Sequence, residues 1–171
     1  MKKIFISSTV LLLSILFYSC GSDKPDNLPV TMTANANKSF SIIASAGSES
    51  SQTVTFTLDD FAAIEEFKRY VESGEIITSS YIEVTGITGE VELVGVKLSM
   101  ERDPSKTYNF RNMITENEKF NTITELNFLQ NIIDELSSRG SSTIRLEYKA
   151  NTAITTPVLV ELYLNSRFSF D

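Results

Sequence analysis

The C-terminal part of the chain alternates between apolar and polar side chains, and this pattern restricts the fold more than any other feature. Over residues 144–149, Ile, Leu and Tyr alternate with Arg, Glu and Lys, and residues 158–164 continue with Val, Val, Leu and Leu at every second position. Each of these strands has one apolar face. Buried parallel strands are apolar on both faces, so the alternation predicts antiparallel pairing around one core.

Weaker alternation predicts further strands upstream. In chain order they lie at residues 39–45, 53–58, 76–85, 90–101 and, as a short strand, near 108–110. Within residues 90–101 the alternation changes phase beside Gly95, which predicts a β-bulge. Gly86 and Gly89 are interpreted as the glycines of a hairpin turn.

Two segments have a helical period instead. In residues 61–71, apolar side chains follow Asp59, a plausible N-cap, and Gly74 fits the position after the helix. The stronger segment has Leu and Ile at the spacing i, i+3, i+4 and i+7, and the residues are Leu129, Ile132, Ile133 and Leu136. Thr122 and Glu125 form a capping-box pattern before it, and Gly140 follows it.

Together these elements predict a mainly β fold. We expect an antiparallel two-layer β-sandwich with two amphipathic helices as crossovers. The alternative is an α+β fold, an antiparallel sheet with both helices on one face. A small outer-membrane barrel is disfavoured, because amphipathic helices and charged strand faces do not suit a lipid-facing wall.

The first 23 residues differ from the rest. Lys2 and Lys3 precede an apolar run over residues 4–18, and a small residue, Ser19, stands before Cys20. A basic start, an apolar middle and a small residue before a cleavage point are typical of a secretory signal peptide. The run is shorter than the roughly 20 residues of a membrane-spanning helix.

The segment Leu16-Phe17-Tyr18-Ser19-Cys20 resembles the lipobox of bacterial lipoproteins. The resemblance implies that Cys20 is lipidated and becomes the new N-terminus after cleavage. Cys20 is also the chain's one cysteine, and an unpaired cysteine in an exported protein needs an explanation. The alternative is an ordinary cleaved signal peptide with an incidental cysteine.

The resemblance gives three regions. Residues 1–19 are the expected signal peptide, residues 20–38 a lipid-anchored flexible tether rich in small polar residues, and residues 39–171 a single β-rich domain. A short edge strand over residues 30–33 is an alternative within the tether.

The resemblance also implies an exported, lipid-anchored location. Gly21 is not the aspartate that retains enterobacterial lipoproteins in the inner membrane, so an outer-membrane anchor is favoured and the membrane face stays open. Residues 22–26 loosely resemble the segment after the cysteine in surface lipoproteins of Bacteroidetes, and a solvated spacer is the alternative.

Composition excludes several function classes. The chain has no histidine, which excludes Ser-His-Asp and Cys-His catalysis and the usual His/Cys zinc sites. No phosphate-binding loop, dinucleotide fingerprint or calcium loop occurs, so we expect no cofactor. The formal net charge is −7, and an acidic surface repels nucleic acid, which is not an expected partner.

Three functional hypotheses remain. The first is a non-enzymatic binding or accessory module at the bacterial envelope, whose partner is a protein or a glycan. Its contact residues would be exposed tyrosines, which otherwise only cover strand faces; they are Tyr81, Tyr108 and Tyr163.

The second hypothesis is a glycan hydrolase that uses paired carboxylates. The candidates are Asp59, Asp60, Glu65, Glu66, Asp134 and Glu135. The third is a pilus- or adhesin-like subunit that assembles by strand addition through residues 28–33.

Overall fold

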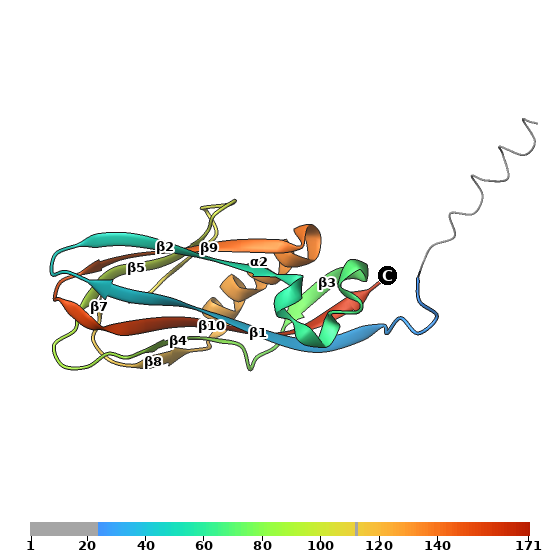
Figure 1. Ribbon diagram of the computed structural model, residues 1–171, viewed down its shortest axis with the longest axis horizontal. Coiled ribbons are helices and arrows are strands. Elements are labelled where there is room, and N and C mark those ends of the chain that lie inside the picture. Colours follow the sequence, from blue (N-terminus) through green and yellow to red (C-terminus); the bar gives the residue numbers. More distant parts are fainter. Residues whose placement is uncertain (1–23, 112) are drawn as a thin grey trace, which may run out of the picture.

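Two antiparallel sheets pack face to face in the computed structural model, which describes residues 24–111 and 113–171 (Figure 1). The first sheet has the order β1-β10-β4-β8, with β3 also paired to β10. Its strands are β1 (Thr31–Ala44), β3 (Val71–Ile76), β4 (Tyr81–Thr85), β8 (Glu118–Phe120) and β10 (Ile154–Phe170). The prediction of a mainly β, two-layer antiparallel sandwich is confirmed, and the alternative α+β fold is not what forms.

The second sheet has the order β2-β9-β5-β6, with β7 also paired to β5. Its strands are β2 (Glu49–Thr57), β5 (Leu93–Met100), β6 (Thr107–Asn109), β7 (Met113–Ile114) and β9 (Ser141–Ala150). Apolar positions of the two alternating segments face the other sheet. The fully buried ones are Ile144, Leu146, Val158, Val160, Leu162 and Leu164.

Successive strands often belong to opposite sheets. The chain passes from one sheet to the other between β1 and β2, between β4 and β5, and between β9 and β10. Gly86 and Gly89 both have positive φ, as a turn requires, but the interpretation as a hairpin turn is wrong because the strands on either side do not pair. A turn glycine permits a change of chain direction, whereas the partner of each strand is decided by contacts elsewhere in the fold.

The helix predicted from the stronger pattern is confirmed as α2 (Ile123–Arg139). Thr122 and Glu125 form the capping box, and Gly140 ends the helix in the left-handed conformation with φ 77°. The helix packs against β3 and β4 of the first sheet and against β6 and β9 of the second, so it bridges the two layers. Gln130 adds a polar link, since its amide oxygen accepts from the N–H of Ile76 at 2.7 Å.

The helix predicted over residues 61–71 is wrong. The segment instead forms three short 3₁₀ turns (Leu58–Asp60, Ala62–Ile64 and Lys68–Tyr70) before β3 begins. Four apolar or aromatic side chains that are buried or half-buried there are spaced by three; they are Phe61, Ile64, Phe67 and Tyr70. A period of three matches the 3.0 residues per turn of a 3₁₀ helix better than the 3.6 of an α-helix.

Gly74 does not follow a helix but lies inside β3. A Cβ atom on it would stand 2.5 Å from Cγ2 of Ile133 and 3.1 Å from the ring of Phe168. The position is therefore occupied by glycine because α2 and β10 approach the backbone of β3 closely.

The predicted bulge in β5 and the predicted N-terminal edge strand can both be compared with the structure. The bulge beside Gly95 is confirmed, because the pairing of β5 with β9 shifts register between Val94 and Lys97. The edge strand is confirmed and is longer than expected, because β1 runs from Thr31 to Ala44 and, among the described strands, pairs with β10 alone. Residues 31–38 thus belong to the folded domain and not to a flexible tether, which is a correction of the expected boundary.

The capping box makes stability depend on pH. Glu125 is 6% exposed and accepts hydrogen bonds from the N–H of Thr122 at 2.7 Å, from the Thr122 hydroxyl and from the Tyr108 hydroxyl. Burial alone would raise the pKa of Glu125, but these hydrogen bonds hold the pKa below its ordinary value of 4.5. Burial, together with the neighbouring Glu125 carboxylate, raises the pKa of Tyr108.

We expect Glu125→Gln to lower the free energy of unfolding by about 1 kcal/mol at neutral pH, the usual contribution of a helix cap. A carboxylate with a lowered folded-state pKa stabilises the fold above its unfolded pKa, and this contribution is lost as pH falls through the folded pKa. The difference between wild type and variant in urea titrations should therefore shrink below pH 4.5. A difference that stays constant from pH 7 to pH 3 would contradict a role for the charge.

Candidate functional site

The two ends of the sandwich differ in what they carry. We call the base the end that holds residues 24–30 and the C-terminal Asp171, and the tip the opposite end, which holds the connections 45–48, 86–92 and 151–153. Strand register fixes this assignment, because Thr31 lies opposite Ser169 at the base and Ala44 lies opposite Ile154 at the tip (Figure 1).

Cys20, the predicted lipidation site, lies outside the described residues. The chain enters the described part at the base, where the Nζ of Lys24 is 2.6 Å from the Oδ1 of Asp171. In residues 24–111 and 113–171, no helix is both long enough and apolar enough to cross a membrane.

The carboxylate candidates near the base form ion pairs and caps. Asp59 pairs with Lys68, and Asp60 pairs with Lys38 at 2.9 Å while accepting from the N–H of Thr57 at 2.7 Å. Burial would raise the pKa of Asp60, but Lys38 and Thr57 hold the pKa below its ordinary value. These contacts connect the first 3₁₀ turn to β1 and β2, which is a structural use of the charges.

The remaining candidates do not form a buried pair either. Glu65 and Glu66 are exposed on the 3₁₀ segment, and Asp134 and Glu135 are neighbours on α2. Within the described part of the chain, Glu125 is the one buried carboxylate. A retaining or inverting glycosidase needs two carboxylates on either side of one bond.

Asp134 and Glu135 do line a hollow of about 290 Å³ beside α2, together with acidic and basic side chains. The full lining is Met100, Arg102, Asp103, Lys106, Asp134, Glu135, Ser138 and Arg139. Glu135 accepts from the Ser142 hydroxyl at 2.7 Å, and its Oε1 is 3.6 Å from the Nε of Arg102. The charges of this hollow are therefore largely balanced, and no excess of either sign is presented to a ligand.

The tyrosine candidates fall into two environments. Tyr81 and Tyr163 are half-buried neighbours on the outer face of the first sheet, stacked with ring centroids 4.9 Å apart. The Nζ of Lys119 lies 3.4 Å from the centroid of the Tyr81 ring, and the Tyr81 hydroxyl donates to Glu161 at 3.2 Å. Both faces of the Tyr81 ring are thus in contact with neighbours of the chain.

Tyr108 is not an exposed contact residue, which corrects the expectation. It is 6% exposed and packs among Phe110, Phe120 and Phe128 while its hydroxyl reaches Glu125. The short strand β6 turns Tyr108 toward the core, and the surrounding sequence has no clear period that would predict this orientation.

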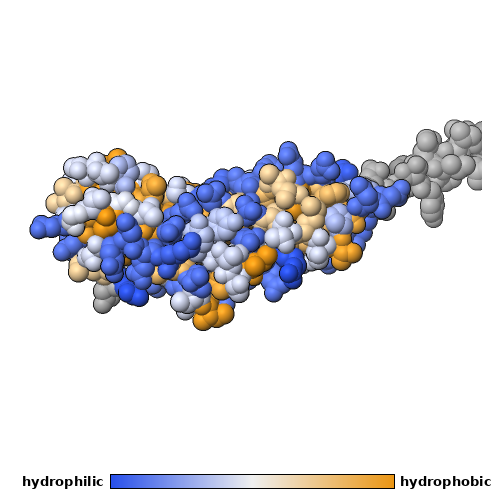
Figure 2. Space-filling view, turned by 90° about the horizontal axis from the view of Figure 1, so that it is seen from below, coloured by the Kyte–Doolittle hydropathy of each residue, from blue (hydrophilic) through white to orange (hydrophobic). Residues whose placement is uncertain are grey.

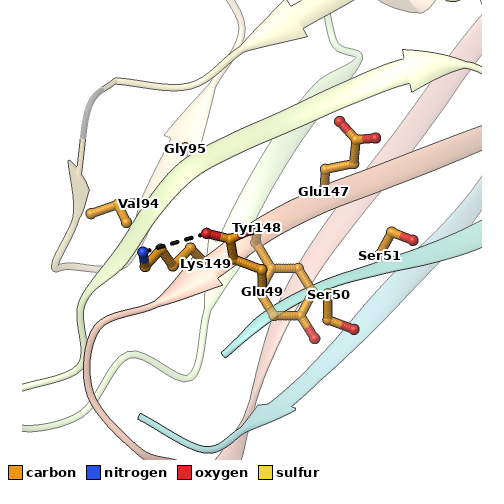
Figure 3. A pocket seen from close by; sticks show the side chains of 8 residues that line it. All are labelled: Glu49, Ser50, Ser51, Val94, Gly95, Glu147, Tyr148 and Lys149. Atoms are coloured by element: carbon orange, nitrogen blue, oxygen red, sulfur yellow. Dashed lines mark ion pairs between the residues drawn. The ribbon is translucent and has the colours of Figure 1, made fainter. Parts of the chain in front are cut away.

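The tip carries three open hollows, with volumes of about 520, 520 and 210 Å³. The first lies over β2, β9 and β5 and is shown in Figure 3. Its lining residues are Glu49, Ser50, Ser51, Val94, Gly95, Glu147, Tyr148 and Lys149. None of these residues was predicted to be functional, although the change of phase at Gly95 marked the position.

The bulge and two ion pairs shape this first hollow. A Cβ atom on Gly95 would meet nothing within 4 Å, so the strand opens toward solvent there. Lys149 pairs with Glu49 at 3.4 Å, drawn as a dashed line in Figure 3, and Lys97 pairs with Glu147 at 2.5 Å. The hollow is polar, with charges of both signs.

The second hollow at the tip is more apolar. It is lined by Ile43, Ala44, Ser45, Ala46, Ala153, Ile154 and Thr155. Ile43 is 63% exposed, and Leu159 on the neighbouring strand is 38% exposed. Apolar and weakly polar residues also show at the tip in the space-filling view, where the base lies toward the grey atoms at the right (Figure 2). The third hollow is lined by Thr88, Glu90, Val91, Thr152, Ala153, Thr155 and Thr156.

Side chains that could bind a metal ion do not form a cluster among the described residues. Over residues 24–111 and 113–171, no cluster of three or more His, Cys, Asp or Glu side chains could hold a metal ion.

Comparisons with known proteins give only distant similarities. No protein-family model and no curated protein matches the chain. Among solved structures, the decameric BFDV capsid protein is similar at 12% identity and a TM-score of 0.42, covering 81% of this chain and 98% of that chain. Desmodium yellow mottle tymovirus is similar at 12% identity and a TM-score of 0.38, covering 86% and 95%. At TM-scores under 0.5, neither similarity establishes a shared function.

Proposed function

We propose that the chain is a bacterial lipoprotein, anchored through Cys20 in the outer membrane, whose sandwich is a non-enzymatic binding module at the envelope. The proposal rests on one observation, which is that the chain entry and the three hollows lie at opposite ends of the sandwich. The chain enters at the base, and the three hollows of the tip lie at the far end of the long strands. An anchor at the base would therefore leave the tip free for a partner.

The tip has features of a recognition surface. Its hollows are built by connections between strands and by adjoining strand ends, and binding residues are commonly found on loops that a rigid scaffold positions. Ile43 offers an exposed apolar contact, while Glu49 and Lys149 offer charged ones. A protein or glycan partner with a mixed polar and apolar surface fits this composition.

The experiment tests anchor and binding together in the native host. Cells are labelled with a palmitate analogue, and the protein is purified from detergent-solubilised membranes after chemical crosslinking. We expect the wild-type protein to carry the label and to stay in the membrane fraction, because two or three acyl chains suffice for stable anchoring. A crosslinked partner should be purified together with it. Cys20→Ala should lose the label, leave the membrane fraction and lose the partner.

Two controls separate the parts of the proposal. Ser8→Ala changes the apolar run of the leader but keeps the lipobox, and it should behave like wild type. Ile43→Asp should keep the label but recover less of the partner. A Cys20→Ala protein that still takes up palmitate would refute the anchor, and an anchored wild type that is reproducibly recovered alone would refute the binding module.

A further inference from the structure

We infer that the base of the sandwich rests against the bilayer surface on a leash of three residues, so that the lipoprotein has almost no spacer. The inference rests on the proposed lipidation of Cys20. It follows from the point at which the chain becomes part of the folded domain, which is Lys24 and not the expected residue 39.

Residues 24–30 are fastened to the base by several contacts. Lys24 pairs with Asp171, and the N–H of Phe170 donates to the carbonyl of Val30 at 3.3 Å. Within the segment, the N–H of Leu28 donates to the carbonyl of Pro25 at 3.0 Å and forms a turn. Leu28 is half-buried and packs against the core. The Lys24 pair is exposed and weakened by salt, so the apolar contact of Leu28 matters more for holding this segment.

The remaining leash is short. Only Gly21, Ser22 and Asp23 separate Cys20 from Lys24, and four peptide units span at most about 14 Å when fully extended. A tether that ran freely to residue 38 would instead span up to about 60 Å. The base therefore stays within about 14 Å of the lipidated cysteine while Lys24 is paired with Asp171, and within about 28 Å when Leu28 alone holds the segment.

The far end lies well beyond that distance. Strand β10 has 17 residues and runs from the tip to the base, and at about 3.3 Å per residue it is about 56 Å long. If the long axis of the sandwich points away from the bilayer, a partner binds the tip far from the lipid headgroups.

The base also carries a side chain suited to a membrane interface. Val30 is 82% exposed, the most exposed of the large apolar side chains in the described part of the chain. The base has charges of both signs, among them Lys24, Arg69 and Asp171. A bilayer surface, with apolar and charged layers within a short distance, is the partner that this mixture fits.

The chain has no tryptophan, so one introduced tryptophan reports a single position. We would place Val30→Trp at the base and Ala46→Trp at the tip, each in the full lipidated protein. Both variants are reconstituted into phosphatidylcholine vesicles that contain a lipid with a dansyl headgroup, which accepts energy from excited tryptophan. The base tryptophan should lose most of its emission, while the tip tryptophan, about 50 Å further away, should lose almost none.

A matched insertion tests whether the short leash is the cause. Twelve Gly/Ser residues between Asp23 and Lys24 add about 20 Å of average reach and should restore much of the emission of the Val30→Trp protein. Equal energy transfer from base and tip, or an insertion without effect, would overturn the inference. Vesicle flotation detects failure of the lipid anchor separately, and a maleimide lipid coupled to Cys20 then tests the leash alone.

Discussion

Phe168→Ala will lower the free energy of unfolding by about 3–5 kcal/mol, the range for removing a buried aromatic ring. The ring of Phe168 is fully buried on β10 and meets the ring of Phe61 edge-on, with centroids 5.0 Å apart. It also lies over Gly74, so its loss opens a cavity at the junction of β10, β3 and the 3₁₀ segment. Urea denaturation followed by circular dichroism measures the change.

Phe170→Ala is the matched control for this prediction. Phe170 is on the same strand but is 8% exposed, and its contact with Phe67 is longer, with centroids 6.1 Å apart. Because its side chain is less enclosed than that of Phe168, its removal leaves a smaller cavity. The loss should be clearly smaller than for Phe168→Ala, and equal losses would contradict the assignment of Phe168 as the centre of packing at the base.

Gly86→Ala will lower the free energy of unfolding by about 2–4 kcal/mol, from left-handed backbone strain combined with a steric clash. Gly86 has φ +84°, and a Cβ atom there would stand 2.5 Å from the carbonyl oxygen of Pro157. That oxygen belongs to the backbone of β10, so it cannot move aside as a flexible side chain would. Thermal and urea unfolding both report the loss.

Gly89→Ala separates the two contributions. Gly89 lies in the same connection with φ +67°, but a Cβ atom on it would meet nothing within 4 Å. Only the backbone strain remains, which costs about 1–2 kcal/mol. If Gly89→Ala destabilised the protein as much as Gly86→Ala, the close approach of β10 would have no energetic role.

These two glycines also bear on the proposed binding surface. Their connection joins β4 to β5 and borders the tip hollow that includes Thr88 and Glu90. Gly86 fixes the connection against β10, whereas Gly89 leaves it open to solvent. The tip thus combines an anchored scaffold with exposed loop positions, which is the arrangement expected of a recognition surface.

Local elements with a regular period could be predicted from the amino-acid sequence. The alternation over residues 144–149 and 158–164 is that of β9 and β10, and the pattern from Thr122 to Gly140 is that of α2 with both of its caps. Such patterns suffice because side chains two, three or four residues apart decide which face of an element is apolar. The lipobox resemblance around Cys20 is equally local, and it remains a prediction because it lies outside the described residues.

Which elements pack against one another became known from the three-dimensional fold. Residues 61–71 were predicted to form one helix, and in the structure they instead include short 3₁₀ turns that pack against β1 and β10. The burial of Tyr108, the hollow at Gly95 and the docking of residues 24–30 all depend on partners far away in the chain, such as Glu125, Lys149 and Asp171. A period fixes the face that a strand buries, because that face depends on side chains close together in the sequence, but the strand it pairs with is chosen by the packing of the whole core. Thr31 and Ser169, for example, pair at the base although 137 residues lie between them in the sequence.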